Sequence, residues 1–217
     1  MKKAIFIFSI LVISLASETA AQQQVMFTQY MFNGLALNPA YAGIHDGPSA
    51  TFLWREQWVG IEGAPSTQTM SFHTPIRYTP VSLGGMILRD KIGVTEQFGG
   101  YFSGSYRMLL GVKSKLSFGM QASFSSFQAD YQNADLRLDS GDPSLDNASV
   151  NVIRPNMGAG LMLHSDKYYV GFSVPQLINQ KLDKNNLDSD SELVRHYFFT
   201  AGVVFDIHKD VKMKPNI

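Results

Sequence analysis

Side chains that could carry acid–base or nucleophilic chemistry are few and widely spaced in this sequence. No two histidines have the H-x-x-x-H or H-E-x-x-H spacing of a helical metal site, and no G-x-S-x-G motif marks a nucleophilic serine. The acidic stretch "DSGDPSLDN", Asp139 to Asn147, could offer carboxylates to Ca²⁺, but its spacing is not that of an EF-hand loop. We therefore expect a protein that is not an enzyme and that needs no metal or cofactor. The histidines are His45, His73, His164, His196 and His208.

The stretch "KLSFGMQASFSSFQ", residues 115–128, indicates which kind of element positions the side chains. Apolar residues alternate with Ser, Gly and Gln over ten residues, from Leu116 to Ser125. Such alternation predicts a β-strand with one apolar and one polar face, because successive side chains of a strand point to opposite sides. A helix with this pattern would have no coherent apolar face.

Seven further segments resemble this strand and give eight candidate strands, most of them 10 to 13 residues long. A strand of a globular protein has about 5–6 residues, whereas a tilted membrane-spanning strand needs about 9–11. Several connections are short, but residues 129–153 and 176–194 form long polar ones, and this asymmetry is typical of outer-membrane barrels. The candidate strands are 49–61, 66–77, 82–91, 97–109, 115–128, 155–165, 168–175 and 195–207.

A soluble β-sandwich is the main alternative, since it also buries one apolar face of each sheet. The polar face is rich in Ser, Gly, Thr and Gln, and charged residues make up 17% of the chain, against about 25% in typical soluble domains. This composition suits a crowded, water-filled lumen better than a solvated sheet. The sequence therefore predicts an all-β fold, an antiparallel transmembrane β-barrel of the bacterial outer membrane.

The N-terminal residues predict export. Two lysines precede a 13-residue apolar run, Ala4 to Ala16, and small residues follow up to Ala21. The run is too short for a membrane-spanning helix, so we expect a signal peptide that is cleaved after about Ala21. The whole chain has 18 basic and 18 acidic residues and no cysteine. That balance gives no support to nucleic-acid binding, and the fold must be stable without disulfides.

The C-terminal residues predict a barrel that is cut short. Lys214-Pro215-Asn216 has the same form as Arg154-Pro155-Asn156, which opens a candidate strand. Proline is tolerated at the first residue of a strand, so a ninth strand should begin there. We therefore divide the chain into a signal peptide (1–21), a periplasmic or plug-like segment (22–46) and an incomplete, C-terminally truncated barrel of about eight strands (47–217).

Arginines lie in or beside several of the candidate strands. On the lipid face near the bilayer midplane each would cost about 2–4 kcal/mol, so we expect them in the lumen or at the rims. They could form an anion-selective ladder, or a structural network with nearby carboxylates, and we favour the network. Its candidate members are Arg55, Glu56, Trp58, Arg89 and Arg107.

Several segments resemble one known family. The stretches "FTQYM" (27–31), "NPAYAG" (38–43) and "REQW" (55–58), followed by "GAPSTQTMSFHTPI" (63–76), are similar in order and spacing to the PorP/SprF family of type IX secretion system outer-membrane proteins. The resemblance extends through "SFGMQASFSSFQ" and "VGFSVPQLIN" and covers the chain from about residue 26 to its end.

This resemblance implies a non-enzymatic barrel of the secretion and gliding motility machinery that supports export or surface attachment of cargo proteins. The implied partners are outer-membrane lipid, a secreted cargo or adhesin domain, and periplasmic components of the machine. A passive or anion-selective diffusion channel is the alternative, and an outer-membrane hydrolase with a Ser–His pair assembled across strands ranks third. We expect loops 129–153 and 176–194 and the N-terminal segment to contact partners.

The neutral stretch "FNGLALNPAYAG", residues 32–43, forms neither a regular helix nor a strand by its composition, because Pro, Gly and Asn favour turns. We hypothesise that residues 26–46 fold against the periplasmic mouth or into the lumen as a plug or docking element. A mere connection to the first strand is the alternative. The candidate partner or plug residues are Phe27, Gln29, Tyr30, Asn38, Pro39, Tyr41 and Gly43.

Overall fold

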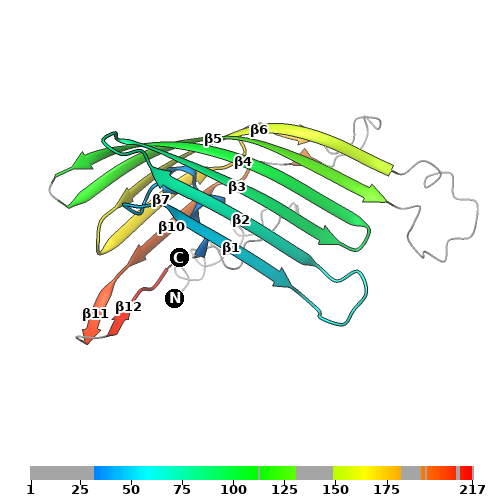
Figure 1. Cartoon of the computed structure of the whole chain (residues 1–217), viewed down its shortest axis with the longest axis horizontal. Coiled ribbons are helices and arrows are strands. Elements are labelled where there is room, and N and C mark those ends of the chain that lie inside the picture. Colours follow the sequence, from blue (N-terminus) through cyan, green and yellow to red (C-terminus); the bar gives the residue numbers. More distant parts are fainter. Residues whose placement is uncertain are drawn as a thin grey trace, which may run out of the picture.

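A single curled sheet dominates the computed structural model, which describes residues 32–111, 113–130, 149–181, 192–193, 195–208 and 211–216. Eight antiparallel strands lie side by side in chain order and form a half-barrel that is open at its first and last strands (Figure 1). The sequence-based prediction of an all-β, antiparallel barrel is confirmed. The strands are β1 (Ser49–Glu56), β2 (Ser66–Pro75), β3 (Val81–Ile92), β4 (Thr95–Leu110), β5 (Ser114–Asp130), β6 (Ser149–His164), β7 (Tyr168–Val174) and β10 (Phe198–Val203).

Short elements complete the described part of the chain. Two 3₁₀ helices, η2 (Gly34–Ala36) and η3 (Pro39–Tyr41), precede β1. Two small hairpins flank β10, one formed by β8 (Gln180–Lys181) with β9 (Glu192–Leu193), the other by β11 (Phe205–His208) with β12 (Val211–Met213). Among the described residues, no helix has the length and hydrophobicity that crossing a bilayer requires. The predicted signal peptide, residues 1–21, lies outside the described ranges.

The two faces of the sheet differ in chemistry as the alternation predicts. On β5, Phe118, Met120 and Phe124 are exposed on the convex face. The alternate residues Ser117 and Gln121 are buried on the concave face. β5 therefore presents apolar side chains outward and small or polar side chains inward, whereas β3 also buries the larger Met86 and Leu88 on the concave face.

Strand register joins the outward residues into apolar rows. One row runs across five strands through Phe52, Met70, Ile87, Gly100 and Phe124. Along β4 the outward positions from Phe98 to Leu110 are all uncharged, over about 40 Å of strand. A tilt of about 35–45° shortens this to about 30 Å, the thickness of a bilayer's hydrocarbon core. The convex face is thus the lipid-facing surface of an outer-membrane type barrel.

The two ends of the barrel carry different connections. The links between β2 and β3, β4 and β5, and β6 and β7 are short, whereas those after β1, β5 and β7 are longer. The link between β3 and β4, from Ile92 to Thr95, is the one short turn at the second end among the eight strands of the sheet. Outer-membrane barrels have short periplasmic turns and longer extracellular loops. The chain enters β1 at the short-turn end, because Ser49 pairs with His73 close to the β2–β3 turn.

Strand ends differ from the predicted ones where turns or loops intervene. β1 stops at Glu56, before Trp58 and Gly60, which both have positive φ. β6 begins at Ser149, inside the predicted loop 129–153. The predicted strand 195–207 divides near Val204, whose N–H donates to the Lys167 carbonyl at 2.7 Å, and β11 then pairs with β12.

Candidate functional site

Residues 32–46, which we call the docked segment, lie on the concave face of the half-barrel (Figure 1). Leu35, Pro39, Ala40 and Ala42 are each about 98–99% buried. Leu35, Ala36 and Ala42 form a hydrophobic cluster with Met86 of β3, and Tyr41 and Tyr101 pack against it. The buried hydrophobic cluster of the molecule is therefore formed between the sheet and its own N-terminal chain.

The two asparagines give the docked segment its turns and attach it to the sheet. The Asn38 side-chain oxygen accepts from the Ala40 N–H at 2.9 Å and so caps η3, in which Pro39 takes the first position. The Asn38 amide also donates to the Leu161 carbonyl of β6 at 3.0 Å. Asn33 accepts from the Ser71 hydroxyl at 3.0 Å. Asn38 thus fixes the local fold and its place on the barrel together.

Serines of the sheet bind the backbone of the docked segment. Ser105 Oγ donates to the Ala42 carbonyl and Ser173 Oγ to the Leu37 carbonyl, each at 2.6 Å. These bonds satisfy carbonyls that burial would otherwise leave unpaired. The Gly43 N–H donates to His73 Nδ1 at 3.2 Å, so the neutral imidazole carries its proton on Nε2.

Glycines on three strands make room for the docked segment. A Cβ at Gly119 would collide with the backbone of Pro39 and Ala40, and one at Gly160 with the Asn38 side chain. At Gly84 a Cβ would lie 3.2 Å from the Leu35 side chain. The glycines of "GAG" (158–160) lie at close backbone or side-chain approaches, because Gly158 faces the Pro175 backbone and Gly160 faces Asn38.

Charged and aromatic groups hold the end of the docked segment at the short-turn end of the barrel. Asp46 accepts from Lys115 Nζ at 3.3 Å and from Arg107 Nη1 at 3.4 Å. The Lys115 hydrogen bond and charge, aided by Arg107, hold the pKa of the Asp46 carboxyl below its ordinary value of 3.8. The carboxyl is largely exposed, so these ion pairs contribute little stability on their own.

Three rings pack beside this ion pair. The rings of His45 and His73 stack with centroids 5.7 Å apart, and Tyr41 meets His73 edge-on at 5.6 Å. Burial raises the pKa of the Tyr41 hydroxyl above its ordinary value. In this part of the chain, no group of three or more His, Cys, Asp or Glu side chains is arranged to hold a metal ion. The arrangement can bind and position a peptide segment.

The predicted segment residues Asn38, Pro39, Tyr41 and Gly43 all lie in this contact. Gly43 has φ +71° and sits against the Ser82 hydroxyl, so glycine suits this position best. Phe27, Gln29 and Tyr30 lie outside the described residues. Most of the predicted partner loops, residues 131–148 and 182–191, also lie outside them.

The structure does not bring the five predicted network residues together. Arg107 binds Asp46 at the short-turn end, whereas Arg89 of the convex face binds Glu96 near the other end at 2.7 Å. Glu56 is exposed at the end of β1, and Trp58 is 67% exposed in the following loop. Arg55 lies half-buried on β1.

The contact residues Ser105, Ser173 and Gly119 were not predicted. Their small, polar character was read as that of a water-filled lumen, whereas here it accommodates a peptide segment. The alternation of Ser and Gly along β5 could have identified Gly119, since a glycine on the buried face of a strand marks close backbone approach. No comparable signal marks Ser105 of β4 or Ser173 of β7.

Comparison with known proteins agrees with this architecture. A family model described as "Type IX secretion system membrane protein PorP/SprF" matches residues 19–217. Searches among curated proteins and among solved structures returned no match. The match covers the docked segment and every described strand, so the chain belongs to the PorP/SprF family of type IX secretion system membrane proteins.

Proposed function

We propose that this protein is a non-enzymatic outer-membrane component of the type IX secretion system that supports export or surface attachment of cargo through protein–protein contacts. Its family membership supports the secretion role. The docked segment supports the contact role, because buried serines and glycines of the sheet accommodate a peptide in its concave face. That segment is the single observation that carries the proposal.

The location of the docked segment supports a proposal for where partners bind. Asp46 lies with Arg107 and Lys115 at the short-turn end, which faces the periplasm in outer-membrane barrels. We propose that this end, with residues 32–46 in place, is the surface that periplasmic components of the machine recognise. A cargo or adhesin domain would contact the opposite end, where the longer connections lie. We also propose that the protein takes part in gliding motility, and that it is itself exported with its signal peptide cleaved near Ala21.

A glycine pair offers a direct test in the cells that carry this system. Gly119→Val would collide with the backbone of Pro39 and Ala40 and displace the docked segment. Gly104→Val is the matched control, because Gly104 lies one strand away on the convex face with no atom within 4 Å of its added Cβ. Both changes suit a strand, since valine is a strong strand former.

Cargo in the medium and barrel in the outer membrane are measured together. We expect Gly119→Val to lower cargo export by at least about tenfold, as a loss of about 1.4 kcal/mol in binding would, with the barrel still folded in the membrane. Gly104→Val should export normally. Normal export by Gly119→Val, with the docked segment shown to be displaced, would refute the proposal.

A diffusion channel is the second candidate, because the concave face carries Arg107 and the buried Arg154. An anion-selective pore would show stable single-channel conductance that rises when residues 32–46 are removed. The proposed secretion role requires no such conductance in the intact chain.

A further inference from the structure

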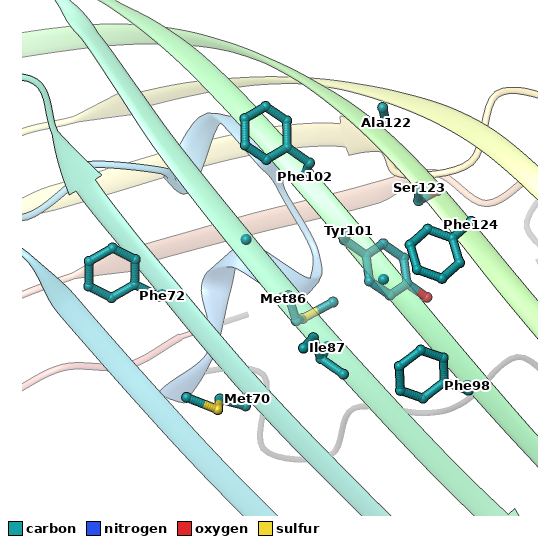
Figure 2. A pocket seen from close by; sticks show the side chains of 12 residues that line it. Met70, Phe72, Met86, Ile87, Phe98, Tyr101, Phe102, Ala122, Ser123 and Phe124 are labelled. Atoms are coloured by element: carbon teal, nitrogen blue, oxygen red, sulfur yellow. The ribbon is translucent and has the colours of Figure 1, made fainter.

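The apolar convex face contains one marked depression. Figure 2 shows the side chains that surround it on β2 to β5, with the rings of Phe98 and Phe124 next to each other. Their ring centroids are 6.4 Å apart. Outward-facing Gly85 forms the open part of the floor, because it contributes no side chain to the lipid-facing surface. At Gly100, which also lines the groove, the Phe124 ring covers the backbone. The groove has a volume of about 630 Å³, and its walls include Met70, Phe72, Ile87 and Phe102.

A polar recess adjoins this groove at its end nearer the β3–β4 turn. Its volume is about 430 Å³, and it shares Phe98 with the groove. Arg89 of β3 and Glu96 of β4 meet there at 2.7 Å, and their side chains are 50% and 36% exposed. The remaining lining residues are Ser126 and Gln128 of β5.

Strand register places this recess at the edge of the apolar band. The row through Met70, Ile87 and Gly100 is apolar, whereas two residues further along the strands Gln68 pairs with Arg89. In the next row Lys91 pairs with Glu96. The ion pair of Arg89 and Glu96 lines the recess, and Lys91 lies beside Glu96 at its edge. These three side chains together carry one positive charge in excess.

We propose that the groove and recess together bind one phosphate-bearing lipid of the outer leaflet. An acyl chain would lie over Gly85 and beside the rings of Phe98 and Phe124, and the phosphate of the headgroup would bind Arg89 and Lys91. The order of surfaces along the strands, apolar and then basic, matches the order of chain and headgroup in such a lipid. The recess lies at the end with the longer connections, which is the extracellular end and so meets the outer leaflet.

A lipid fits this surface better than a protein partner does. The groove lies within rows of side chains that face the hydrocarbon core, where acyl chains are the surrounding solvent. Association of protein segments inside a bilayer lacks a hydrophobic driving force, because lipid tails are as apolar as the side chains. A cationic site at the edge of the apolar band attracts anionic headgroups, and each basic residue there strengthens binding about fivefold.

Two glycines provide the variant and its control. Gly85→Leu fills the groove without strain, because an added Cβ would meet only the Tyr101 carbonyl oxygen, at an ordinary 3.7 Å. Gly104→Leu adds the same side chain to the same lipid-facing surface outside the groove, where nothing lies within 4 Å. Arg89→Gln with Lys91→Gln removes the cations and leaves the groove unchanged.

The measurement is native mass spectrometry of the purified full chain from micelles that contain either dimyristoyl phosphatidylglycerol or dimyristoyl phosphatidylcholine. Wild type and Gly104→Leu should each retain one phosphatidylglycerol in preference to phosphatidylcholine. Gly85→Leu should lower retention of both lipids several-fold. The double glutamine variant should lose the preference for phosphatidylglycerol, by about fivefold or more.

Equal retention of the two lipids by wild type would overturn the proposal, as would unchanged retention by Gly85→Leu. A Gly85→Leu chain that binds lipid normally but loses a protein partner would assign the groove to that partner instead. Heat-modifiable migration in gels confirms that each variant is folded. These outcomes are independent of cargo export and so of the function proposed above.

Discussion

At the scale of single residues, asparagine and serine side chains on the concave face make the hydrogen bonds that water would make in an open lumen. Asn38 caps η3 with its oxygen and reaches β6 with its nitrogen. Ser105 and Ser173 donate to the carbonyls of Ala42 and Leu37. Burying an unpaired carbonyl would cost about 1–3 kcal/mol. The polar face of the barrel therefore provides hydrogen-bond partners for the backbone of the buried docked segment.

The ion pair at Asp46 predicts how the docked segment responds to pH. The folded pKa of Asp46 lies below its ordinary value of 3.8, so its contribution is complete above that value and is lost as pH falls through the folded pKa. A spin label at Gly47→Cys, where an added side chain meets nothing within 4 Å, reports on this end of the segment. We expect constant label mobility from pH 8 to pH 5 and greater mobility below about pH 4.

Asp46→Asn is the control for that experiment, because it cannot form the ion pair at any pH. Its label should be as mobile at neutral pH as that of wild type in acid. A transition centred between pH 6 and 7 would contradict this account.

At the scale of elements, β5 predicts how the barrel tolerates charge. Met120 lies in the middle of the outward apolar run from Leu116 to Phe124 and is 61% exposed, whereas Gln128 is an outward residue near the polar end of the strand. Met120→Arg should cost about 2–4 kcal/mol and Gln128→Arg about 0–1 kcal/mol, because the cost depends on depth in the bilayer.

Urea titration of folding into phosphatidylcholine bilayers measures both costs. Equal effects of the two substitutions would contradict a lipid-facing convex surface. They would favour the soluble β-sandwich, in which depth along the strand has no such meaning.

Alternation predicted the strands well and their ends less well. The pattern of β5 identifies its two faces without ambiguity, since every second residue from Leu116 to Phe124 is apolar. The early end of β1 depends on the backbone angles of Trp58 and Gly60, and composition does not encode these. The division between β10 and β11 depends on a hydrogen bond from Val204 to Lys167, a contact between distant residues.

The sequence predicted the segment that docks at the candidate site, but not the sheet residues that hold it. The unusual composition of residues 32–43 marks the docked segment, but its position depends on Ser71, Gly119 and Ser173, which lie far away in sequence. A row of small polar residues on a strand can face a water-filled lumen or bind a peptide segment equally well. Only the folded sheet, which brings β2 to β7 under one segment, decides between them.

At the scale of the whole molecule, the described residues form a membrane half-barrel whose buried hydrophobic cluster lies between the sheet and the docked segment. The convex face meets lipid, and the concave face meets residues 32–46 (Figure 1). Secretion contacts, and the lipid site near Arg89, both depend on this separation of the two faces. Above all, the docked segment occupies the concave face of the barrel in the membrane.

Thiol crosslinking in intact outer membranes tests that claim most directly, because the chain has no cysteine of its own. Ala42→Cys with Ser105→Cys joins two buried residues that share a hydrogen bond, while Ala42→Cys with Gly104→Cys moves the second thiol to the convex face. We predict efficient crosslinking by a short bifunctional thiol reagent for residues 42 and 105, and none for 42 and 104. Absence of the 42–105 crosslink in a folded barrel, or equal yields from both pairs, would contradict the account.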